Sequence, residues 1–431
     1  MEWIVRARRQ WRIHRQLWLS RRLWSKRLVF WGGALAIGLV SVAFASAADG
    51  ARMLFDRAHA VGWWVPLVLT PLGFVVSAQL ARTVFPGSQG SGIQQAIAAM
   101  EIAEPSGRSG LLSLRIAVGK IVLTLLGLAS GASIGREGPT VQVGASIMLA
   151  AGRLGGVGRP RMLILAGSAA GISAAFNTPI AGIVFAIEEM ARSFELRASG
   201  FVLTAVIIAG LVSLALVGNY DYFGAASGRV VGTEGWLLVG VCGLLGGAFG
   251  AIFSAAMLTG VRRLRAFIAP APLARSLMIA FAAGLASALI GIATGGITFG
   301  TGYDVAKAAL QGAATPWYFA PSKLVATLLA AFSGIPGGIF APSLAVGAGF
   351  GALIASVFGT VVAPAALLGM TGYFAGVVQA PITAFVIILE MTADTSDTVP
   401  VMCAALIGYG VARLVSRESL YHGLAKAYLK H

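Results

Sequence analysis

The chain has 431 residues, of which 57% are hydrophobic and only 11% are charged, and its mean hydropathy is +0.84. A soluble globular protein carries about 25% charged residues, so the composition excludes that class and predicts a polytopic membrane protein. The formal net charge of +16 would suit a nucleic-acid-binding protein. Half of that excess, however, lies beside tryptophans at one end of the chain, which indicates contact with membrane lipids and no nucleic-acid partner.

Residues 1–28 are expected to form a basic amphipathic arm on the cytoplasmic surface of the membrane. They hold nine Arg and Lys against one acid, Glu2, which is a net charge of +8 (nine minus one), and four tryptophans are interleaved with them. Such a mixture binds anionic headgroups at the membrane interface. A signal peptide is the alternative, because Ala45-Ser46-Ala47 resembles a cleavage site, but the basic region is too long for one.

Apolar stretches long enough to cross or enter a bilayer follow the arm. They lie near 29–48, 63–84, 115–134, 162–190, 200–217, 235–260, 276–296, 320–333, 339–362, 365–391 and 398–415, with a polar connection after the first. They lack the alternation of an outer-membrane barrel, so the fold class is all-α. We expect a first membrane half at 29–217, an extracytoplasmic linker at 218–236, a second half at 237–424 and a short tail at 425–431.

The segment from Pro86 to Gln95 is predicted to be a loop followed by a helix. Three glycines fall within the six residues from Gly87 to Gly92, which is unfavourable for a helix interior. The Ser91 hydroxyl and nearby backbone N–H groups would then lie at a helix start near Gln94, where an anion can bind. A dinucleotide site is the alternative, but no βαβ pattern flanks the loop.

The segment Gly135-Arg136-Glu137-Gly138-Pro139-Thr140 places an acid beside a predicted helix start at about Pro139. The free N–H groups of such a start attract anions. Glu137 is therefore expected to occupy an anion position when charged and to leave it when protonated. These six residues leave two alternatives open: a carboxylate that only stabilises the helix dipole, or a polar re-entrant loop.

Two adjacent acids, Glu188 and Glu189, end an apolar helix that follows Pro179. The simplest interpretation of Glu188 is that it marks the water boundary. Lys120 lies within another apolar stretch, and we expect it to be a buried charge partner of Glu188 or Glu101. The alternative is that its stem lies along the apolar surface while the ammonium reaches water.

Charge asymmetry predicts the topology. The arm is strongly basic, the linker at 218–236 has a single arginine, and the next connection, at 262–275, has four. By the positive-inside rule, the first half starts in the cytoplasm and ends outside, and the second half returns, so both termini are cytoplasmic. The side of the basic connection at 153–161 stays open.

An internal repeat agrees with this topology. Pro179–Glu188 resembles Pro381–Glu390 at an offset of 202 (381 minus 179), and Gly138–Gly144 resembles Ala341–Gly347 at an offset of 203 (341 minus 138). Halves that each cross an odd number of times must be inverted, and inverted repeats with broken and tilted helices are typical of transporters. The second-half counterpart, Gly334–Ser343, has no acid, so Glu137 is the asymmetric and gating element.

Three motifs carry a resemblance to a known family. They are Gly90-Ser91-Gly92-Ile93, Gly135–Pro139 and Gly338-Ile339-Phe340-Ala341-Pro342. In these motifs and in their order, the chain resembles the CLC family of chloride channels and proton-coupled chloride transporters. The resemblance implies a homodimer whose subunits each contain a chloride pathway. The implied chloride-binding residues are Ser91, Gly92, Ile93, Arg136, Gly138, Ile339, Phe340 and Tyr421, with Glu137 as the external gate.

One departure from the family is Gln94, where the family usually has proline, and this bears on the rigidity of the helix start. Serine at position 91 favours chloride, because nitrate-selective members tend to carry proline there. Glu189 matches the glutamate that hands protons inward in the transporters of the family.

Carboxylates in apolar surroundings exchange protons near neutral pH, so Glu137 and Glu189 together favour a chloride/proton antiporter of the inner membrane. The alternative is a passive chloride-selective channel. An intramembrane hydrolase that uses Glu137 as general acid or base is a rival from another class, but no nucleophile accompanies it. His14, His59, His422 and His431 show no metal-ligand spacing, so we expect neither an enzyme nor a bound metal or cofactor.

Overall fold

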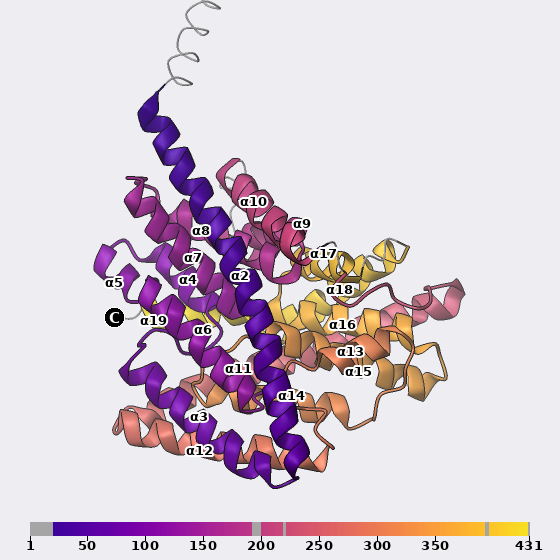
Figure 1. Ribbon diagram of the computed structural model, residues 1–431. Helices are drawn as coiled ribbons and strands as arrows, with labels where there is room; N and C mark the ends of the chain where they lie inside the picture. The colour runs from indigo at the N-terminus through magenta and orange to yellow at the C-terminus, as the bar shows by residue number, and fades with distance from the viewer. Residues whose placement is uncertain (1–19, 192–199, 219–220, 393–395, 430–431) are drawn as a thin grey trace, which may run out of the picture.

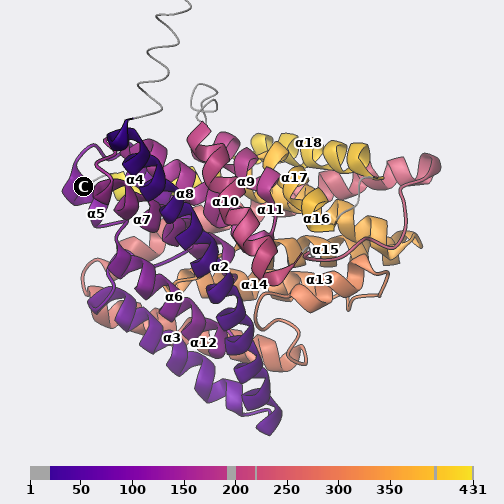
Figure 2. The same ribbon diagram turned by 45° about the horizontal axis from the view of Figure 1, so that its top comes forward.

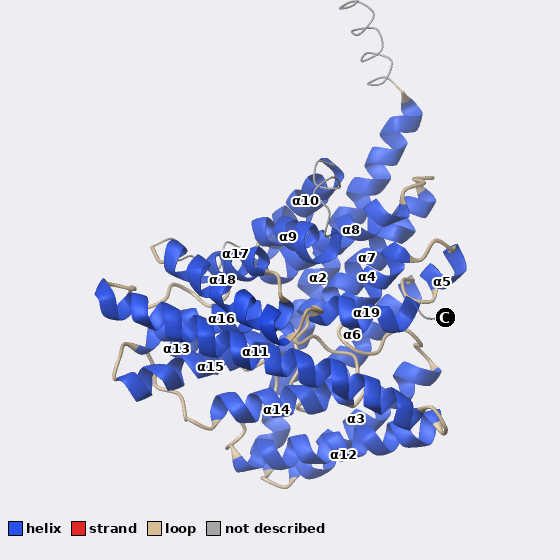
Figure 3. Cartoon of the chain, turned by 180° about the vertical axis from the view of Figure 1, so that it is seen from behind, coloured by secondary structure: helices blue, strands red, loops and turns tan. Residues whose placement is uncertain are grey.

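The computed structural model describes residues 20–191, 200–218, 221–392 and 396–429. These residues form helices joined by loops, and their only β-bridges are two isolated pairs (Figure 3). The predicted all-α class is confirmed. Residues 1–19, which make up most of the expected basic arm, lie outside the described residues.

The helices of the first half are α2 (Arg21–Val61), α3 (Val65–Thr83), α4 (Ile93–Glu101), α5 (Pro105–Ser109), α6 (Leu114–Ala129), α7 (Glu137–Leu154), α8 (Pro160–Phe176), α9 (Pro179–Phe185), the π-helix η1 (Ala186–Ala191) and α10 (Gly200–Val217). Those of the second half are α11 (Gly232–Ile268), α12 (Pro272–Ala293), α13 (Tyr303–Leu310), α14 (Phe319–Phe332), α15 (Phe340–Phe358), α16 (Val362–Val378), α17 (Pro381–Thr392), α18 (Thr398–Val415) and α19 (Leu420–Leu429). Figure 1 shows the long α2 beside the indigo and magenta helices of the first half, with α3 and α12 side by side at the lower edge.

Eight helical segments in the described part of the chain are long and apolar enough to cross a membrane. They are Trp24–Val61, Val65–Thr83, Pro105–Ala129, Gly200–Val217, Gly232–Ile268, Pro272–Ala293, Phe340–Phe358 and Thr398–Val415. Other apolar helices have only 10–17 residues, among them α8, α14, α16 and α17. The mixture of long and short helices agrees with the expected polytopic architecture of broken helices.

Helix α2 is longer than the sequence predicted. Its 41 residues continue through the segment 49–59, which we expected to be a polar connection, and it already includes residues 21–28 of the expected arm. At 1.5 Å per residue, it is about 60 Å long, twice the hydrocarbon thickness. The charges in its last turns are accommodated by ion pairs: Arg52 pairs with Asp56 four residues on and with Asp304 of α13. A polar segment therefore did not end the helix.

Helices α11 and α19 are also longer than the sequence predicted. Helix α11 begins at Gly232, five residues before the expected start of the second half at 237. Glu234 lies in its first turn, where a carboxylate favours the helix dipole. Helix α19 extends to Leu429, so most of the tail expected at 425–431 is helical.

The basic connection at 153–161 lies at the same end of the molecule as the start of α2. A Cβ atom on Gly155 would be 3.2 Å from Cβ of Val29. Arg153 donates a hydrogen bond to the Ser109 hydroxyl at the end of α5, and Figure 2 shows α5 and α4 near the start of α2. The last described helix, α19, packs against α4. The connection therefore belongs to the face that carries both ends of the described chain.

The two halves repeat each other at a helix break. Asn177 (φ 58°) and Gln379 (φ 56°) are the non-glycine residues with positive φ in the described ranges, and they are 202 positions apart (379 minus 177). Each ends one helix, α8 or α16, and the next helix begins at a proline two residues later. Left-handed backbone is unfavourable for most side chains, so its occurrence at equivalent positions supports a true structural repeat.

Each half also caps a helix of the other half. The Glu188 carboxylate accepts hydrogen bonds from the N–H groups of Ile382 (3.1 Å) and Thr383 (2.5 Å) at the start of α17. Glu390, its counterpart in the repeat, accepts from Ile180 (3.0 Å) and Ala181 (2.6 Å) at the start of α9. Glu188 is therefore more than a marker of the water boundary: it satisfies N–H groups that a helix start leaves without partners.

We expect Glu390→Ala to destabilise the fold, because it removes two charge-assisted hydrogen bonds at the start of α9. The expected loss is about 1–3 kcal/mol, and Glu390→Gln, which keeps one acceptor oxygen, should lose less. Thermal unfolding in detergent measures both. Glu104→Ala is the control, since this exposed side chain makes no capping hydrogen bond. Equal unfolding temperatures for Glu390→Ala and the control would contradict the capping role.

Glycines allow α11 to pack against two neighbours at once. A Cβ on Gly247 would lie 2.6 Å from Cα of Gly408 in α18, and one on Gly246 would lie 2.7 Å from the backbone nitrogen of Tyr373 in α16. Close backbone contact of this kind is a common way to associate helices in membranes, where burial of apolar surface from water is not available. These contacts hold α16, α18 and α11 as one unit behind the central core.

Candidate functional site

The loops before α4, α7 and α15 are hydrogen-bonded to one another at the interface between the halves. The Gly90 N–H donates to Ile335 (3.2 Å), and the Gly90 carbonyl accepts from Gly337 (3.1 Å). Gly135 and Gly338 exchange two further bonds, of 2.7 and 2.8 Å. The pairing brings the N-terminal ends of three helices together, and free N–H groups at such ends form an anion site.

Ser91 and Tyr421 contribute two hydroxyl groups to this junction. Both side chains are buried, and their hydroxyl oxygens lie near each other. Within the described residues, neither hydroxyl makes a hydrogen bond of normal geometry. Because a buried hydroxyl without a partner is costly, two of them at one point indicate a place for a bound acceptor such as an anion.

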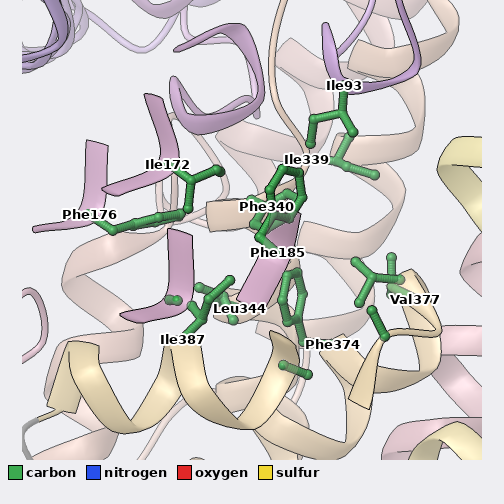
Figure 4. Packing of buried hydrophobic residues seen from close by; sticks show 14 of the residues in the cluster. Ile93, Ile172, Phe176, Phe185, Ile339, Phe340, Leu344, Phe374, Val377 and Ile387 are labelled. Atoms are coloured by element: carbon green, nitrogen blue, oxygen red, sulfur yellow. The ribbon is translucent and has the colours of Figure 1, made fainter. Parts of the chain in front are cut away.

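Phe340, at the start of α15, forms the apolar wall of the site. Its ring lies 5.9 Å from that of Tyr421, 6.1 Å from that of Phe185 and 4.8 Å from that of Phe374. Figure 4 shows Phe340 between Phe185 and Phe374, with Ile339 and Ile93 nearby. These apolar side chains lower the polarity around the helix ends, so that the partial charges there are screened less than in water.

Gly138 permits the closest approach in the site. A Cβ at this position would lie 2.9 Å from the Ser91 carbonyl oxygen and 3.3 Å from Cα of Gly338, and it would also overlap the Ser91 hydroxyl. Gly92 adopts a φ of 106°, which L side chains rarely accept. Both glycines therefore expose backbone N–H groups that a side chain would cover.

Glu137 is the first residue of α7, two positions before the predicted helix start at Pro139. Its side chain is fully buried, and one carboxylate oxygen lies directly over the missing Cβ of Gly135. The carboxylate faces the backbone N–H groups of Glu137 itself and of Ala341 on α15. It therefore occupies the position where helix ends from both halves favour a negative charge.

The Arg136 side chain points away from this position. Its guanidinium donates to the Ala45 carbonyl and to Asp49 (3.2 Å), both on α2. Any direct contact of Arg136 with a bound anion would therefore come from its backbone N–H. The guanidinium lines a cavity of about 460 Å³, here called the outer cavity, together with Asp49, Arg52 and Asp304.

A second cavity, here called the inner cavity, has a volume of about 370 Å³ and reaches Ser91, Ile339 and Tyr421. Arg82 and Arg265 also line it. The paired loops lie between the two cavities, with Arg136 on one side and Ser91 on the other. This arrangement suits a pathway with its narrowest part at Glu137.

The prediction that Lys120 pairs with Glu188 or Glu101 was wrong. The fully buried Lys120 ammonium donates to the Gly90 carbonyl oxygen at 2.8 Å, in the loop before α4. Glu188 caps α17, and Glu101 is exposed at the end of α4. The fold brings the Gly90 carbonyl within hydrogen-bond distance of the ammonium, whereas one acid caps another helix and the other is exposed.

Lys323 is a second fully buried lysine that the sequence analysis missed. Its ammonium donates to the carbonyl oxygens of Thr298 (2.8 Å) and Gly300 (2.6 Å). It lies 203 positions after Lys120 (323 minus 120), and both are followed four residues later by threonine. The offset of the repeat, applied to Lys120, would have identified Lys323 from the sequence. Each half thus has a buried lysine that supports a glycine-containing loop.

Glu189 lies on η1, well inside the protein, and its side chain is 2% exposed. The His422 ring of α19 lies close to it, with Nδ1 3.5 Å from the Glu189 Oε1 atom. π-Helical turns inside apolar helices are rare and occur frequently at functional sites. The structure thus brings Glu189 close to α19, the helix that carries Tyr421.

Comparisons with known proteins agree with this geometry. The family model described as "Voltage gated chloride channel" matches residues 72–413. The H(+)/Cl(-) exchange transporter ClcA of Citrobacter koseri is 30% identical over 414 residues, which cover 89% of this chain and 84% of the relative. ClcA of Salmonella typhimurium is 30% identical over 412 residues, with the same coverage.

Two solved structures share the fold. A slow cyanobacterial Cl−/H+ antiporter has a TM-score of 0.81 at 24% identity, covering 96% of this chain and 99% of that one. A CLC-type fluoride/proton antiporter has a TM-score of 0.77 at 24% identity, covering 93% and 97%. The family model and the ClcA relatives extend over most of the sequence, and the paired loops carry the three motifs. The chain belongs to the voltage gated chloride channel (CLC) family.

Proposed function

We propose that this protein is a chloride/proton antiporter: a transporter and not an enzyme. The observation that carries the proposal is the Glu137 carboxylate, which is buried at the meeting point of helix ends between the outer and inner cavities. A charged carboxylate there excludes an anion from the same position. A protonated one is released and carries a proton, so movement of the anion and movement of the proton become linked.

Chloride is proposed to bind at the inner side of Glu137. The Ser91 and Tyr421 hydroxyls and the backbone N–H groups of Ile339 and Phe340 would donate to it, while Gly92, Ile93 and Gly138 shape the approach. The two buried hydroxyls without partners support this assignment. A halide accepts hydrogen bonds from several such donors at once, which suits a site made from helix ends.

Antiport is favoured over a passive channel by Glu189. A channel needs no second proton-binding group, whereas an antiporter must bring protons to Glu137 from the other side. Glu189 is buried and lies on the side of Tyr421. The relatives named H(+)/Cl(-) exchange transporter support the same choice.

The protein is further proposed to be a homodimer of the inner membrane with both termini in the cytoplasm. The basic residues of the arm at 1–28 and of the connections at 153–161 and 262–275 would then lie at the cytoplasmic surface, as the positive-inside rule requires. The arm would bind anionic lipid headgroups.

The experiment is transport by the purified protein in liposomes. A chloride gradient is expected to drive protons in the opposite direction, and the reversal potential is expected to shift with a pH gradient. A reversal potential that does not respond to pH would establish a channel.

In the same assay, Glu189→Gln should abolish proton flux while chloride flux continues, because the amide cannot carry a proton. Glu234→Gln, an exposed acid in the first turn of α11, is the control and should retain both fluxes. Retained proton flux in Glu189→Gln would remove Glu189 from the pathway.

A further inference from the structure

His422 lies between Glu189 and the surface of the protein. It follows Tyr421 in the first turn of α19. Its Nδ1 atom is 3.5 Å from the Glu189 Oε1 atom and 3.4 Å from the Ser419 hydroxyl oxygen. The His422 side chain is 16% exposed and that of Glu189 is 2% exposed. The imidazole therefore has access to water on one side and contact with a buried carboxylate on the other.

The other charged groups of this region are engaged with one another. Glu418 pairs with Lys426 and with Arg262 of α11, both at 2.7 Å. The hydrogen bond from Lys426 and the nearby Arg262 hold the pKa of Glu418 below its usual value, so this acid stays charged. Arg265, also on α11, lies 5.3 Å from the Tyr428 ring centroid. None of these contacts involves His422.

In the described part of the chain, the remaining elements near α19 add no competing acid. The neighbouring Glu188 of η1 caps α17, while α4 contributes the neutral Gln94 and Gln95, and α16 contributes Tyr373. Glu101, at the far end of α4, is exposed. Among the residues that the structure describes, the acid in contact with His422 is therefore Glu189.

We propose that His422 is the relay residue that passes protons between the cytoplasmic solution and Glu189. This inference rests on the proposed antiport. A hydronium ion from the solution protonates Nε2, which gives the imidazolium and leaves water, and the proton on Nδ1 then moves to the Glu189 carboxylate. The imidazole is left neutral with its proton on Nε2. It returns to the starting Nδ1–H tautomer when Nε2 releases its proton to water and Nδ1 takes one up from water, so that one proton has moved from the solution to Glu189 in each cycle.

Imidazole suits this step because it has a donor and an acceptor on opposite sides of one ring and changes charge within the physiological pH range. A separation of 3.5 Å closes to hydrogen-bond length with a small side-chain movement. Histidine at this position thus offers a way for protons to reach a carboxylate that water itself contacts poorly.

The test is the ratio of proton to chloride flux of the full-length His422→Asn variant in liposomes, with equal pH on both sides, measured from pH 5 to pH 8. Asparagine keeps the polarity and approximate size of the residue but cannot be protonated. We expect proton flux to fall about tenfold or more while chloride flux falls less, so that the ratio drops. The dependence of proton flux on pH should also flatten.

His59→Asn is the matched control. This histidine lies in the last turn of α2, where its ring contacts Phe55 and Phe299. It is not in contact with Glu137 or Glu189, the two acids of the proposed proton pathway. A second variant, His422→Ala, tests the chemistry directly, since free imidazole in the buffer should restore proton flux to it and should not affect the control.

Three results would overturn the relay. They are an unchanged flux ratio and pH profile in His422→Asn, a proportional fall of both fluxes, which indicates a structural role only, and a failure of imidazole to restore proton flux to His422→Ala. A wild-type protein that moves no protons would instead overturn the antiport, and the relay with it. The two failures are therefore distinguished by the wild-type measurement.

Discussion

Glu137→Gln is expected to move chloride without moving protons. The amide has nearly the same shape as the carboxylate but carries no charge and cannot exchange a proton, so it neither competes with chloride as an anion nor couples the two fluxes. Proton flux should fall to background, and chloride flux should become independent of pH. Simultaneous chloride and pH electrode recordings from liposomes measure both quantities.

The Glu234→Gln control removes a carboxylate from an exposed helix start at another place in the fold. It should keep the flux ratio and the pH dependence of the wild type. If Glu137→Gln still carried protons against a chloride gradient, the gating and proton-transfer role of Glu137 would be wrong, even though its carboxylate lies at the junction of the helices.

Gly138→Ala is expected to abolish transport. The added methyl group would overlap the Ser91 hydroxyl and lie 2.9 Å from the Ser91 carbonyl oxygen. The second half cannot yield easily, because Gly338 is held to Gly135 by two hydrogen bonds. We expect a destabilisation of about 1–3 kcal/mol from overpacking, together with loss of chloride flux because Ser91 is displaced. Chloride uptake and thermal unfolding in detergent are the measurements.

Gly240→Ala provides the comparison for this variant. Gly240 lies within the long α11, and a Cβ added there would meet nothing within 4 Å. Alanine is a better helix former than glycine, so this variant should be at least as stable as the wild type and fully active. Normal chloride flux in Gly138→Ala would show that the close approach of the two halves is not needed for transport.

The composition and the order of apolar stretches were sufficient to predict the fold class. Lipid cannot satisfy backbone polar groups, so an apolar chain without strand alternation has to be helical. The prediction of helix ends was less accurate where polar residues lay inside a long helix. The last turns of α2 remain helical because Asp49 and Arg52 find partners on other elements, Arg136 and Asp304, which are far away in the sequence.

The internal repeat could be predicted in part from the sequence. Its offset correctly related the proline starts of α9 and α17, but the reciprocal caps by Glu188 and Glu390 follow only from the antiparallel arrangement of these helices. The same offset relates Lys120 to Lys323. Sequence spacing shows that two residues are equivalent, but it does not show which atoms they contact.

Glycine and proline patterns by themselves determined where the helices of the candidate site begin, because these residues restrict or free the backbone locally. They also identified Glu137 as the acid at such a start. Only the tertiary structure decided which partner each buried polar group has: Lys120 donates to Gly90, the Arg136 guanidinium contacts α2, and His422 lies beside Glu189. Buried polar groups bind the acceptor that lies nearest in space, and chain folding sets that distance.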